Sequence, residues 1–347
     1  MLIGVPQVSC GGNLGSTPLV KRHPALLALL ATGCAAASGG GAGAFTPAGE
    51  AARGPFTLTS LMIVLGAVVY ALVGVVVLVA LRRRGAAPSA RGRADTHRFD
   101  RRMIIVGGIL LPTPILLTLL VGNIYVLAGQ TRGGPLRIEI EGRQYWWEIR
   151  YPAQGIIDAN EVHIPTGERV ELVLTSADVI HSWWVPELSG KRDLIPGREN
   201  VLVVEADRPG VYRGQCAEFC GIQHGNMAMF VVAQEPAEFA GWVRSHARLA
   251  VLRPATASLR RGQDVFMSNC AGCHTVAGTP ADGRQGPDLT HFASRMTIGA
   301  GAVPNDRGNL GGWVANAQSI KPGNRMPPIP VPADGMNDLL DYVESLR

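Results

Sequence analysis

The stretch Gly214–Met229 reads G-Q-C-A-E-F-C-G-I-Q-H-G-N-M-A-M and offers several metal-binding side chains at short spacing. We call it the ligand loop. Its donors are two thiols, an imidazole and a thioether: Cys216, Cys220, His224 and Met227. Thiolates and thioethers are soft ligands, and imidazole suits both copper and zinc. A second imidazole, His181, precedes the loop in V-I-H-S-W-W. Two cysteines, where a blue-copper site has one, supply enough sulfur to bridge a pair of copper ions.

Two other interpretations compete with copper at this loop. A structural zinc site uses closely spaced Cys and His, and it needs neither Met227 nor the distant His181. A disulfide between the two cysteines would leave His224 and Met227 without a role. Because the copper interpretation accounts for every donor, we favour it over both.

These residues resemble the CuA site of cytochrome c oxidase subunit II, with H-S-W followed by C-x-E-x-C-x-x-x-H-x-x-M. In that family both thiolates bridge two coppers, each copper takes one His, and a Met and the backbone carbonyl of the Glu are weak axial ligands. Carried over by position, the resemblance implies these copper ligands: His181, Cys216, Glu218, Cys220, His224 and Met227. It also implies that the Glu218 side chain helps to bind magnesium near subunit I, where Asp193 resembles a second acidic position.

An aromatic run, G-R-Q-Y-W-W-E-I-R-Y at residues 142–151, is a further point of resemblance. Aromatic clusters are usually part of a core, which is the alternative here. In subunit II proteins the equivalent G-H-Q-W-Y-W run forms the patch near CuA where electrons come in. Tyr145 stands in place of the first Trp, and Trp146 and Trp147 follow it. The resemblance therefore implies an electron-input patch made of these three residues, without singling out one of them.

Two uncharged stretches predict a membrane-spanning hairpin. The chain has 347 residues, room for two or three domains, and 47% of them are hydrophobic. Leu58–Leu81 and Met103–Gln130 carry no charge, and about 20 apolar residues cross a bilayer as a helix. We expect spans at about 58–81 and 103–128 within residues 58–130, the second kinked by its prolines. A buried helix of a soluble protein is the alternative for each. Such a hairpin is the membrane part of the subunit II family.

The basic charge of the chain is concentrated between the two expected spans. Residues 82–102 hold eight Arg and two Asp, a net charge of +6. This is more than the formal net charge of +5 of the whole sequence. This distribution predicts a cytoplasmic loop by the positive-inside rule and argues against a nucleic-acid partner. Everything after residue 130 should then lie outside the cytoplasm.

The N-terminus has the pattern of a targeting segment. A basic K-R-H precedes a short apolar run that ends in A-T-G-C, so residues 1–34 predict a signal. The ending resembles a lipoprotein signal with Cys34 as the lipid-bearing residue; a plain signal peptide or an uncleaved tail is the alternative. Residues 35–57 form a Gly- and Ala-rich linker. Cys10 has no assigned role.

Short alternating segments fill residues 131–234 and predict an all-β domain. Examples are R-I-E-I-E, E-V-H-I-P and R-V-E-L-V-L, separated by Pro-Gly turns. About seven such strands suggest an antiparallel sandwich or barrel, in which the ligand loop joins two late strands. The family resemblance implies a cupredoxin-like fold.

A second motif, C-A-G-C-H at residues 270–274, is the attachment pattern of c-type haem. We expect thioether bonds from Cys270 and Cys273, and iron ligation by His274; a redox C-x-x-C is the alternative. For the sixth ligand Met326, in the rigid G-N-R-M-P-P loop, is favoured over Met296 and Met336. Residues 235–255 predict a linker helix, and residues 256–347 resemble an all-α class I cytochrome c domain.

The order of hairpin, CuA domain and cytochrome c domain resembles subunit II of caa-type haem–copper oxidases. The resemblance implies an electron-input subunit that passes electrons from haem c to CuA and on to haem in subunit I, where oxygen is reduced and protons are pumped. It implies other oxidase subunits and an external cytochrome c or cytochrome bc complex as partners, on the outer face of a bacterial cytoplasmic membrane.

Three alternatives were weighed against this function. A CuA-type nitric oxide reductase stays open until the partner catalytic subunit is identified. A nitrous oxide reductase needs a His-rich copper site, which five histidines scattered along the sequence do not predict. They are His23, His97, His163, His246 and His291. A copper-delivery or electron-storage protein would form no stable complex with a large membrane subunit.

Overall fold

The computed structural model describes residues 43–83, 90–129, 133–247 and 254–347. The predicted signal with Cys10 and Cys34 lies outside these residues. So do the side chains of residues 84–97.

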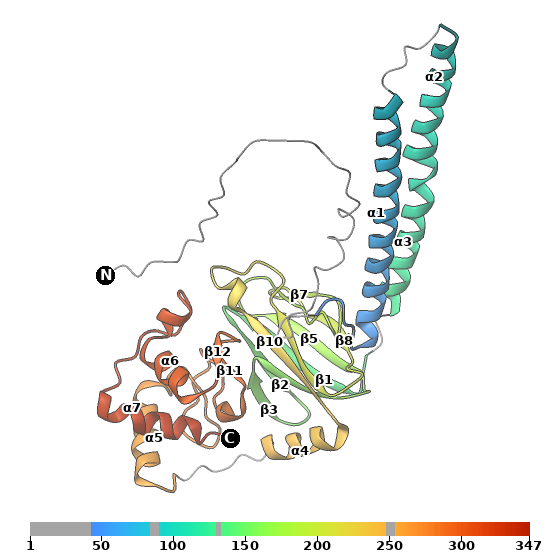
Figure 1. Cartoon of the computed structure of the whole chain (residues 1–347). Coiled ribbons are helices and arrows are strands. Elements are labelled where there is room, and N and C mark those ends of the chain that lie inside the picture. Colours follow the sequence, from blue (N-terminus) through green and yellow to red (C-terminus); the bar gives the residue numbers. More distant parts are fainter. Residues whose placement is uncertain (1–42, 84–89, 130–132, 248–253) are drawn as a thin grey trace, which may run out of the picture. The chain divides into compact units, whose positions relative to one another are not determined.

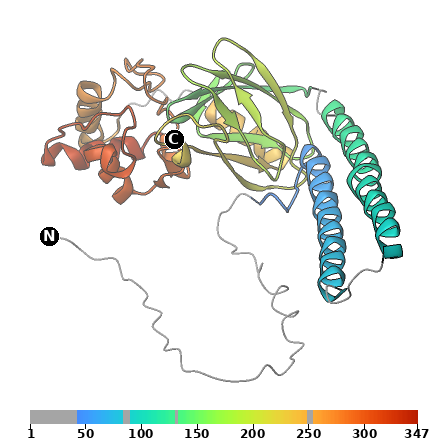
Figure 2. The same cartoon turned by 90° about the horizontal axis from the view of Figure 1, so that it is seen from above.

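The first part of the chain is a pair of long helices that lie side by side (Figures 1 and 2). Within the described residues, two helical stretches are long and apolar enough to cross a membrane, Glu50–Arg82 and Arg98–Ala128. These spans agree with the two predicted ones but begin earlier in the chain. The helices are α1 (Glu50–Arg83), α2 (Ala90–Ile105) and α3 (Pro112–Gly129), with the π-helix η2 (Val106–Leu110) between the last two.

The described residues of the Arg-rich segment between the spans, 82–83 and 90–102, are helical. Helix α1 continues to Arg83 and α2 begins at Ala90. Arg and Ala are good helix formers, so both helices extend beyond their apolar parts. The π-turn stands directly before Pro112, where Leu111 N–H donates to Val106 O at 2.9 Å. Because Pro112 has no N–H to donate to the carbonyl four residues earlier, the regular helical hydrogen bonding is interrupted there. The preceding N–H instead bonds to the carbonyl five residues earlier.

The β domain, residues 136–234, contains a five-stranded sheet and a three-stranded sheet that share one apolar core (Figure 1). Side chains alternate along the strands; Ile138 and Ile140 are buried, while Arg137 is exposed and Glu139 is half-buried. The first sheet has the order β3-β2-β1-β5-β8: Ile156–Ala159, Trp146–Tyr151, Leu136–Arg143, Val170–Ser176 and Asn200–Val204. The second has the order β4-β10-β9: Glu161–Pro165, Ala228–Gln234 and Gly210–Gln215.

The prediction of a purely antiparallel arrangement was wrong. Strand β1 pairs with β5 in parallel, and β4 pairs with β10 in parallel. Alternation of apolar and polar residues reports only that one face of a strand is buried, so it carries no information on strand direction. The two parallel pairs give the mixed sheets of a cupredoxin-like domain.

Three connections of the β domain bring the predicted ligands together. The ligand loop joins the antiparallel neighbours β9 and β10, as expected. His181 begins the short strand β6 (His181–Trp183), which pairs with β7 (Arg192–Leu194). The backbone N–H of Ala217 donates to Ser182 O at 3.0 Å, and this bond fixes β6 against the ligand loop.

The helical domain, residues 257–346, has its own apolar core. Its helices are α5 (Ala257–Asn269), α6 (Arg307–Ile320) and α7 (Ala333–Glu344), with the short helix η4 (Phe292–Ser294) and strands β11 (Thr297–Ile298) and β12 (Val303–Pro304) between them. Helix α4 (Pro236–His246) precedes the domain. Helices α5 and α7 cross closely because Gly262 has no Cβ, which would overlap the Asp338 carbonyl.

Candidate metal and haem sites

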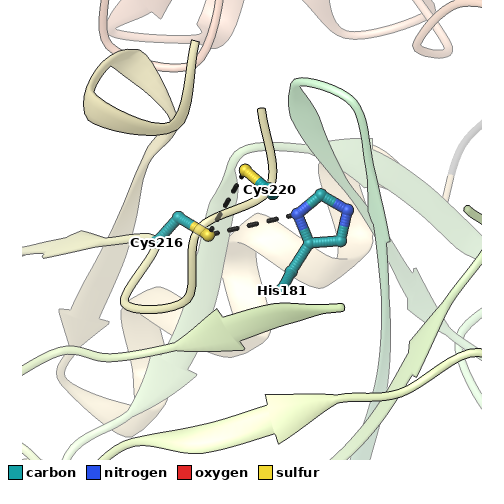
Figure 3. Close-up of side chains that lie close together, drawn as sticks. All are labelled: His181, Cys216 and Cys220. Carbon is teal, nitrogen blue, oxygen red and sulfur yellow. Dashed lines mark hydrogen bonds between the residues drawn. The ribbon is translucent and has the colours of Figure 1, made fainter. Parts of the chain in front are cut away.

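Two buried cysteines form the centre of the first site. Cys216 Sγ and Cys220 Sγ lie 3.8 Å apart, and His181 Nδ1 lies 4.0 Å from Cys216 Sγ (Figure 3). A disulfide requires about 2.05 Å between the sulfurs, and both cysteines are free. Of the described residues, only His181, Cys216 and Cys220 form a cluster of Cys, His and acidic groups that could hold a metal ion.

The remaining predicted ligands surround the same two sulfurs. Cys220 Sγ lies 3.8 Å from His224 Nδ1 and 3.8 Å from Met227 Sδ. The carbonyl oxygen of Glu218 lies 3.3 Å from Cys216 Sγ. A metal ion bound at about 2.3 Å to sulfur and about 2.0 Å to nitrogen can link such atoms up to about 4.3 Å apart. The donors therefore fit a metal centre in both number and spacing.

Electrostatics at the site favour one thiolate already in the metal-free chain. The hydrogen bond between the sulfurs lowers the pKa of Cys216 and raises that of Cys220, so the pair tends to share one proton. Burial opposes a charge on His181, but its hydrogen bonds to Asp178 and Cys216 outweigh that and raise its pKa. A soft metal ion would replace the shared proton.

Three supporting residues escaped the sequence analysis. Asp178 Oδ1 lies 2.8 Å from His181 Nε2, which leaves Nδ1 directed at Cys216. Gln144 Nε2 donates to Cys220 O at 2.6 Å, and Gln215 Nε2 donates to His224 O at 3.0 Å. Only Asp178 had a signal in the sequence, because it stands three residues before His181.

The predicted aromatic patch divides between surface and core. Trp147 is fully buried and meets His181 edge-on at 5.8 Å between ring centroids. Tyr145 and Trp146 are half-buried. The hydroxyl of Tyr145 lies against Gly221 of the ligand loop, where a Cβ would overlap it. Of the three aromatic rings, Trp147 is therefore the one in contact with His181 from inside the domain.

The two acidic positions lie in segments that also carry or adjoin the proposed ligands. Glu218 is half-buried in the ligand loop. Asp193 is half-buried in β7, where it pairs with Ser182, the residue after His181.

The second site lies at the end of α5 in the helical domain. Cys270 caps that helix and is buried, while Cys273 and His274 are partly exposed. His274 Nδ1 lies 2.8 Å from Pro287 O, which assigns the proton to Nδ1 and leaves Nε2 free as a ligand. A Cβ at Gly286 would overlap the His274 ring. Burial lowers the pKa of His274, which favours the neutral imidazole that iron requires. These residues fit a c-type haem.

The methionines of the helical domain occupy three different settings. Met326 is half-buried in an ordered loop, where its N–H donates to Asn324 Oδ1 at 2.8 Å and its carbonyl accepts from Gln318 Nε2 at 2.7 Å. Met296 is 37% exposed, and its N–H bonds to the β domain. Met336 packs against the core of the helical domain.

Two protein-family models match this chain. Residues 153–234 match the periplasmic domain of cytochrome c oxidase subunit II, and residues 259–347 match cytochrome c. A probable cytochrome c oxidase subunit 2 of Rickettsia bellii is 30% identical over 186 residues, 47% of this chain and 69% of that protein. The chain belongs to the cytochrome c oxidase subunit II family. The two family models show a subunit II periplasmic domain joined to a cytochrome c domain.

Other subunit II proteins match with higher identity. Cytochrome c oxidase subunit 2 of Alkalihalophilus pseudofirmus is 40% identical, with 60% of this chain and 61% of that protein covered. That of Bacillus sp. strain PS3 is 34% identical, with 54% and 55% covered. This subunit II chain thus spans less than two thirds of the length of either relative. A crystal structure of the periplasmic domain of subunit II from Bradyrhizobium japonicum is 30% identical and covers 33% of this chain and 95% of that one, with a TM-score of 0.32.

The match to the subunit II periplasmic domain implies copper in the β domain, and the match to cytochrome c implies haem c in the helical domain. Together with the two candidate spans, the subunit II match describes a membrane-anchored protein with a periplasmic domain.

Three of the histidines that are scattered along the sequence of this subunit II chain lie together in the structure. His163 stacks on Trp242 at 4.3 Å, Trp242 on His246 at 4.5 Å, and His246 lies 4.3 Å from His291. These residues come from three distant segments, so only the fold brings them together. They form a stack of rings, and the described residues give no metal-binding cluster there.

Proposed function

We propose that this chain is the electron-input subunit of a terminal cytochrome c oxidase. The helical domain would hold haem c and the β domain a dinuclear CuA centre, and these groups would supply an electron path from an external cytochrome c or cytochrome bc complex to haem in subunit I, for oxygen reduction coupled to proton pumping. Both domains would lie on the outer face of a bacterial cytoplasmic membrane. A CuA-type nitric oxide reductase is the alternative, and the identity of the catalytic subunit would distinguish the two.

The observation that carries this proposal is the convergence of four further donors on the two cysteine sulfurs. The two cysteine sulfurs lie 3.8 Å apart and each has its own imidazole within 4.0 Å, so this donor set would suffice for two copper ions. The proposed ligands are His181, Cys216, Glu218 through its carbonyl, Cys220, His224 and Met227. A zinc site would leave the Met227 thioether without a role. The Glu218 side chain remains the proposed magnesium ligand, with Asp193 beside β6.

The chain's own residues hold and shield this centre. Asp178 accepts the Nε2–H of His181 and orients the ring. Gln144 and Gln215 fix the ligand loop through the carbonyls of Cys220 and His224. Trp147 and Trp183, both fully buried, pack edge-on at 5.4 Å and exclude water behind His181. Rigid ligands of this kind reduce reorganisation when an electron arrives or leaves.

In the helical domain, we propose that Cys270 and Cys273 bind haem covalently and that His274 and Met326 ligate its iron. Pro287 O holds the His274 ring through Nδ1, and Asn324 and Gln318 hold the backbone of Met326. Thioether ligation raises the potential of a haem.

The Cys216→Ser variant tests the copper assignment. It should abolish the mixed-valence copper spectrum of the purified protein and leave the c-type haem bands intact, because the two sites lie in separate cores. Unchanged copper signals would place the ligands elsewhere.

A pair of methionine variants tests the sixth haem ligand. Met326→Ala should remove the methionine–iron charge-transfer band, whereas Met296→Ala should retain it. The reverse result would reassign the ligand to Met296.

A further inference from the structure

A buried lysine joins the two domains beside the ligand loop. Lys321 caps the C-terminus of α6 and is 2% exposed. Its Nζ donates to Gly299 O in the helical domain at 2.7 Å and to Tyr145 O in the β domain at 2.9 Å. One ammonium group therefore binds a carbonyl of each domain.

The setting of Lys321 is unusual for a lysine. Lysine is almost never fully buried without a charged partner, and among the described ion pairs none joins Lys321 to a carboxylate. Burial lowers its pKa to about 7. Burial of this ammonium group costs free energy. The hydrogen bond to Gly299 O within the helical domain does not by itself account for that cost. The bond to Tyr145 gives the group a role in the contact between domains.

The residues that follow Lys321 extend the contact toward the ligand loop. Pro322 O accepts from Gln223 Nε2 at 2.6 Å. Arg325, next to Met326, donates to Gln144 Oε1 at 2.8 Å and lies 3.4 Å from Asp178 Oδ2. Gln144 and Asp178 are the two residues that hold Cys220 O and the His181 ring. The segment before the proposed haem ligand thus rests on the groups that support the proposed copper ligands.

A second part of the same contact contains a buried ion pair. Arg295 Nε donates to Asp158 Oδ1 at 2.8 Å, and both side chains are less than 5% exposed. Nearby, Met296 N–H donates to Glu161 Oε1 at 2.7 Å. Separating the domains would expose or unpair both charges, and the loss of one partner of a buried pair is strongly destabilising.

A backbone hydrogen bond also joins the two domains. Ala228 N–H, directly after Met227, donates to Ala300 O at 2.9 Å. Ala300 and the two glycines around it have positive φ, and a Cβ at Gly301 would come within 2.8 Å of the Ala228 Cβ. This turn therefore fits closely on the start of β10.

We propose that Lys321 is a positioning residue that fastens the helical domain to the ligand loop, so that this domain is a fixed relay and not a swinging carrier. The relay role depends on the proposed function; the fastening does not. Lys321 acts by holding the backbone at Tyr145 and the backbone at Gly299 in a fixed position relative to each other. The contacts of Gln223, Arg325 and Ala228 then form around it.

Hydrogen exchange of the full-length holoprotein in detergent tests the fastening without relying on either metal. Two amides report on separation of the domains, because their bonds cross the contact: Ala228 N–H and Met296 N–H. Lys321→Met keeps the bulk and removes the donors. It should speed exchange at both amides by about tenfold or more. Amides of β5 and α5 should keep their protection, which shows that both domains remain folded.

Lys191→Met is the matched control, because Lys191 is an exposed lysine of the β domain. It should leave exchange at both reporter amides unchanged. If Lys321→Met also leaves them unchanged, the proposal is overturned, whatever metals the protein carries. A local role of Lys321 inside the helical domain would not change exchange at Met296, which bonds to Glu161.

The distance between the two proposed centres in the unmodified protein gives a second measurement that needs no variant. Pulsed EPR relaxation of the copper signal by the oxidised haem should give one narrow distance distribution in the wild type and in Lys191→Met. It should broaden in Lys321→Met. A broad distribution in the wild type would overturn the fixed relay, and absence of a mixed-valence copper signal would instead refute the proposed function.

Discussion

Glu161 links the stability of the domain contact to pH at the scale of a single residue. It is 2% exposed, and burial together with nearby Asp158 raises its pKa to about 7. Since the folded-state pKa lies above the ordinary value, its favourable contribution is complete below about 4.5 and is lost as pH rises through 7. We expect the wild type to lose about 3 kcal/mol relative to Glu161→Gln between these limits.

The measurement is the unfolding midpoint of both proteins across pH 4.5 to 8, taken as a difference so that other titrating groups cancel. Glu238→Gln, an exposed carboxylate of α4, should follow the wild-type curve. If the wild type and Glu161→Gln give parallel curves, Glu161 is charged throughout and the burial argument is wrong.

Spacing in the sequence predicted which residues meet at the ligand loop but not what supports them. Cys216, Cys220 and His224 are close in sequence, and a short loop can present them together. Lys321 lies 176 residues from Tyr145, and Arg295 lies 137 from Asp158. Such contacts depend on how two complete domains meet, which no local pattern encodes.

The ligand loop as an element depends on one glycine with an unusual backbone. Gly221 has φ of +127°, and a Cβ there would overlap the Tyr145 hydroxyl. Gly221→Ala should therefore destabilise the loop by roughly 1–3 kcal/mol and reduce copper content after reconstitution. Metal analysis and the thermal midpoint of the purified protein measure the two effects.

Gly225 provides the matched control within the same loop. A Cβ at Gly225 meets nothing within 4 Å, and its φ is not positive. Gly225→Ala should retain copper and stability. Equal losses in the two variants would mean that the loop tolerates no side chain at either position, and that backbone strain is not the cause.

Elements with a strong apolar period could be predicted, and those without one could not. The two spans and strands β1, β4 and β5 follow their patterns. Helix α6 was missed because R-G-N-L-G-G-W-V contains three glycines, which disfavour a helix. It forms because Leu310 and Val314 are buried and Asp306 caps its start through Asn309 N–H at 2.9 Å. Tertiary packing overrides propensity there.

For the whole molecule, the proposed electron donor, haem c, and the proposed acceptor, the copper centre, lie on one chain. We therefore expect electron transfer between them to follow intramolecular kinetics. The tether gives the helical domain an effective concentration of the order of mM at the β domain. The proposed contact around Lys321 further fixes the orientation of one domain on the other. The rate of electron transfer from haem c to copper should not change on dilution. It should depend less on salt than reduction by a free cytochrome does. Stopped-flow measurements at several protein concentrations test this, and a rate that falls with dilution would refute it.

We propose that one chain carries two copper ions and one haem outside the membrane. Metal analysis of intact, fully matured protein, combined with EPR, is the decisive measurement. We expect two copper ions for each covalently bound haem and a mixed-valence copper signal. Zinc in place of copper, or one copper per chain, would contradict it.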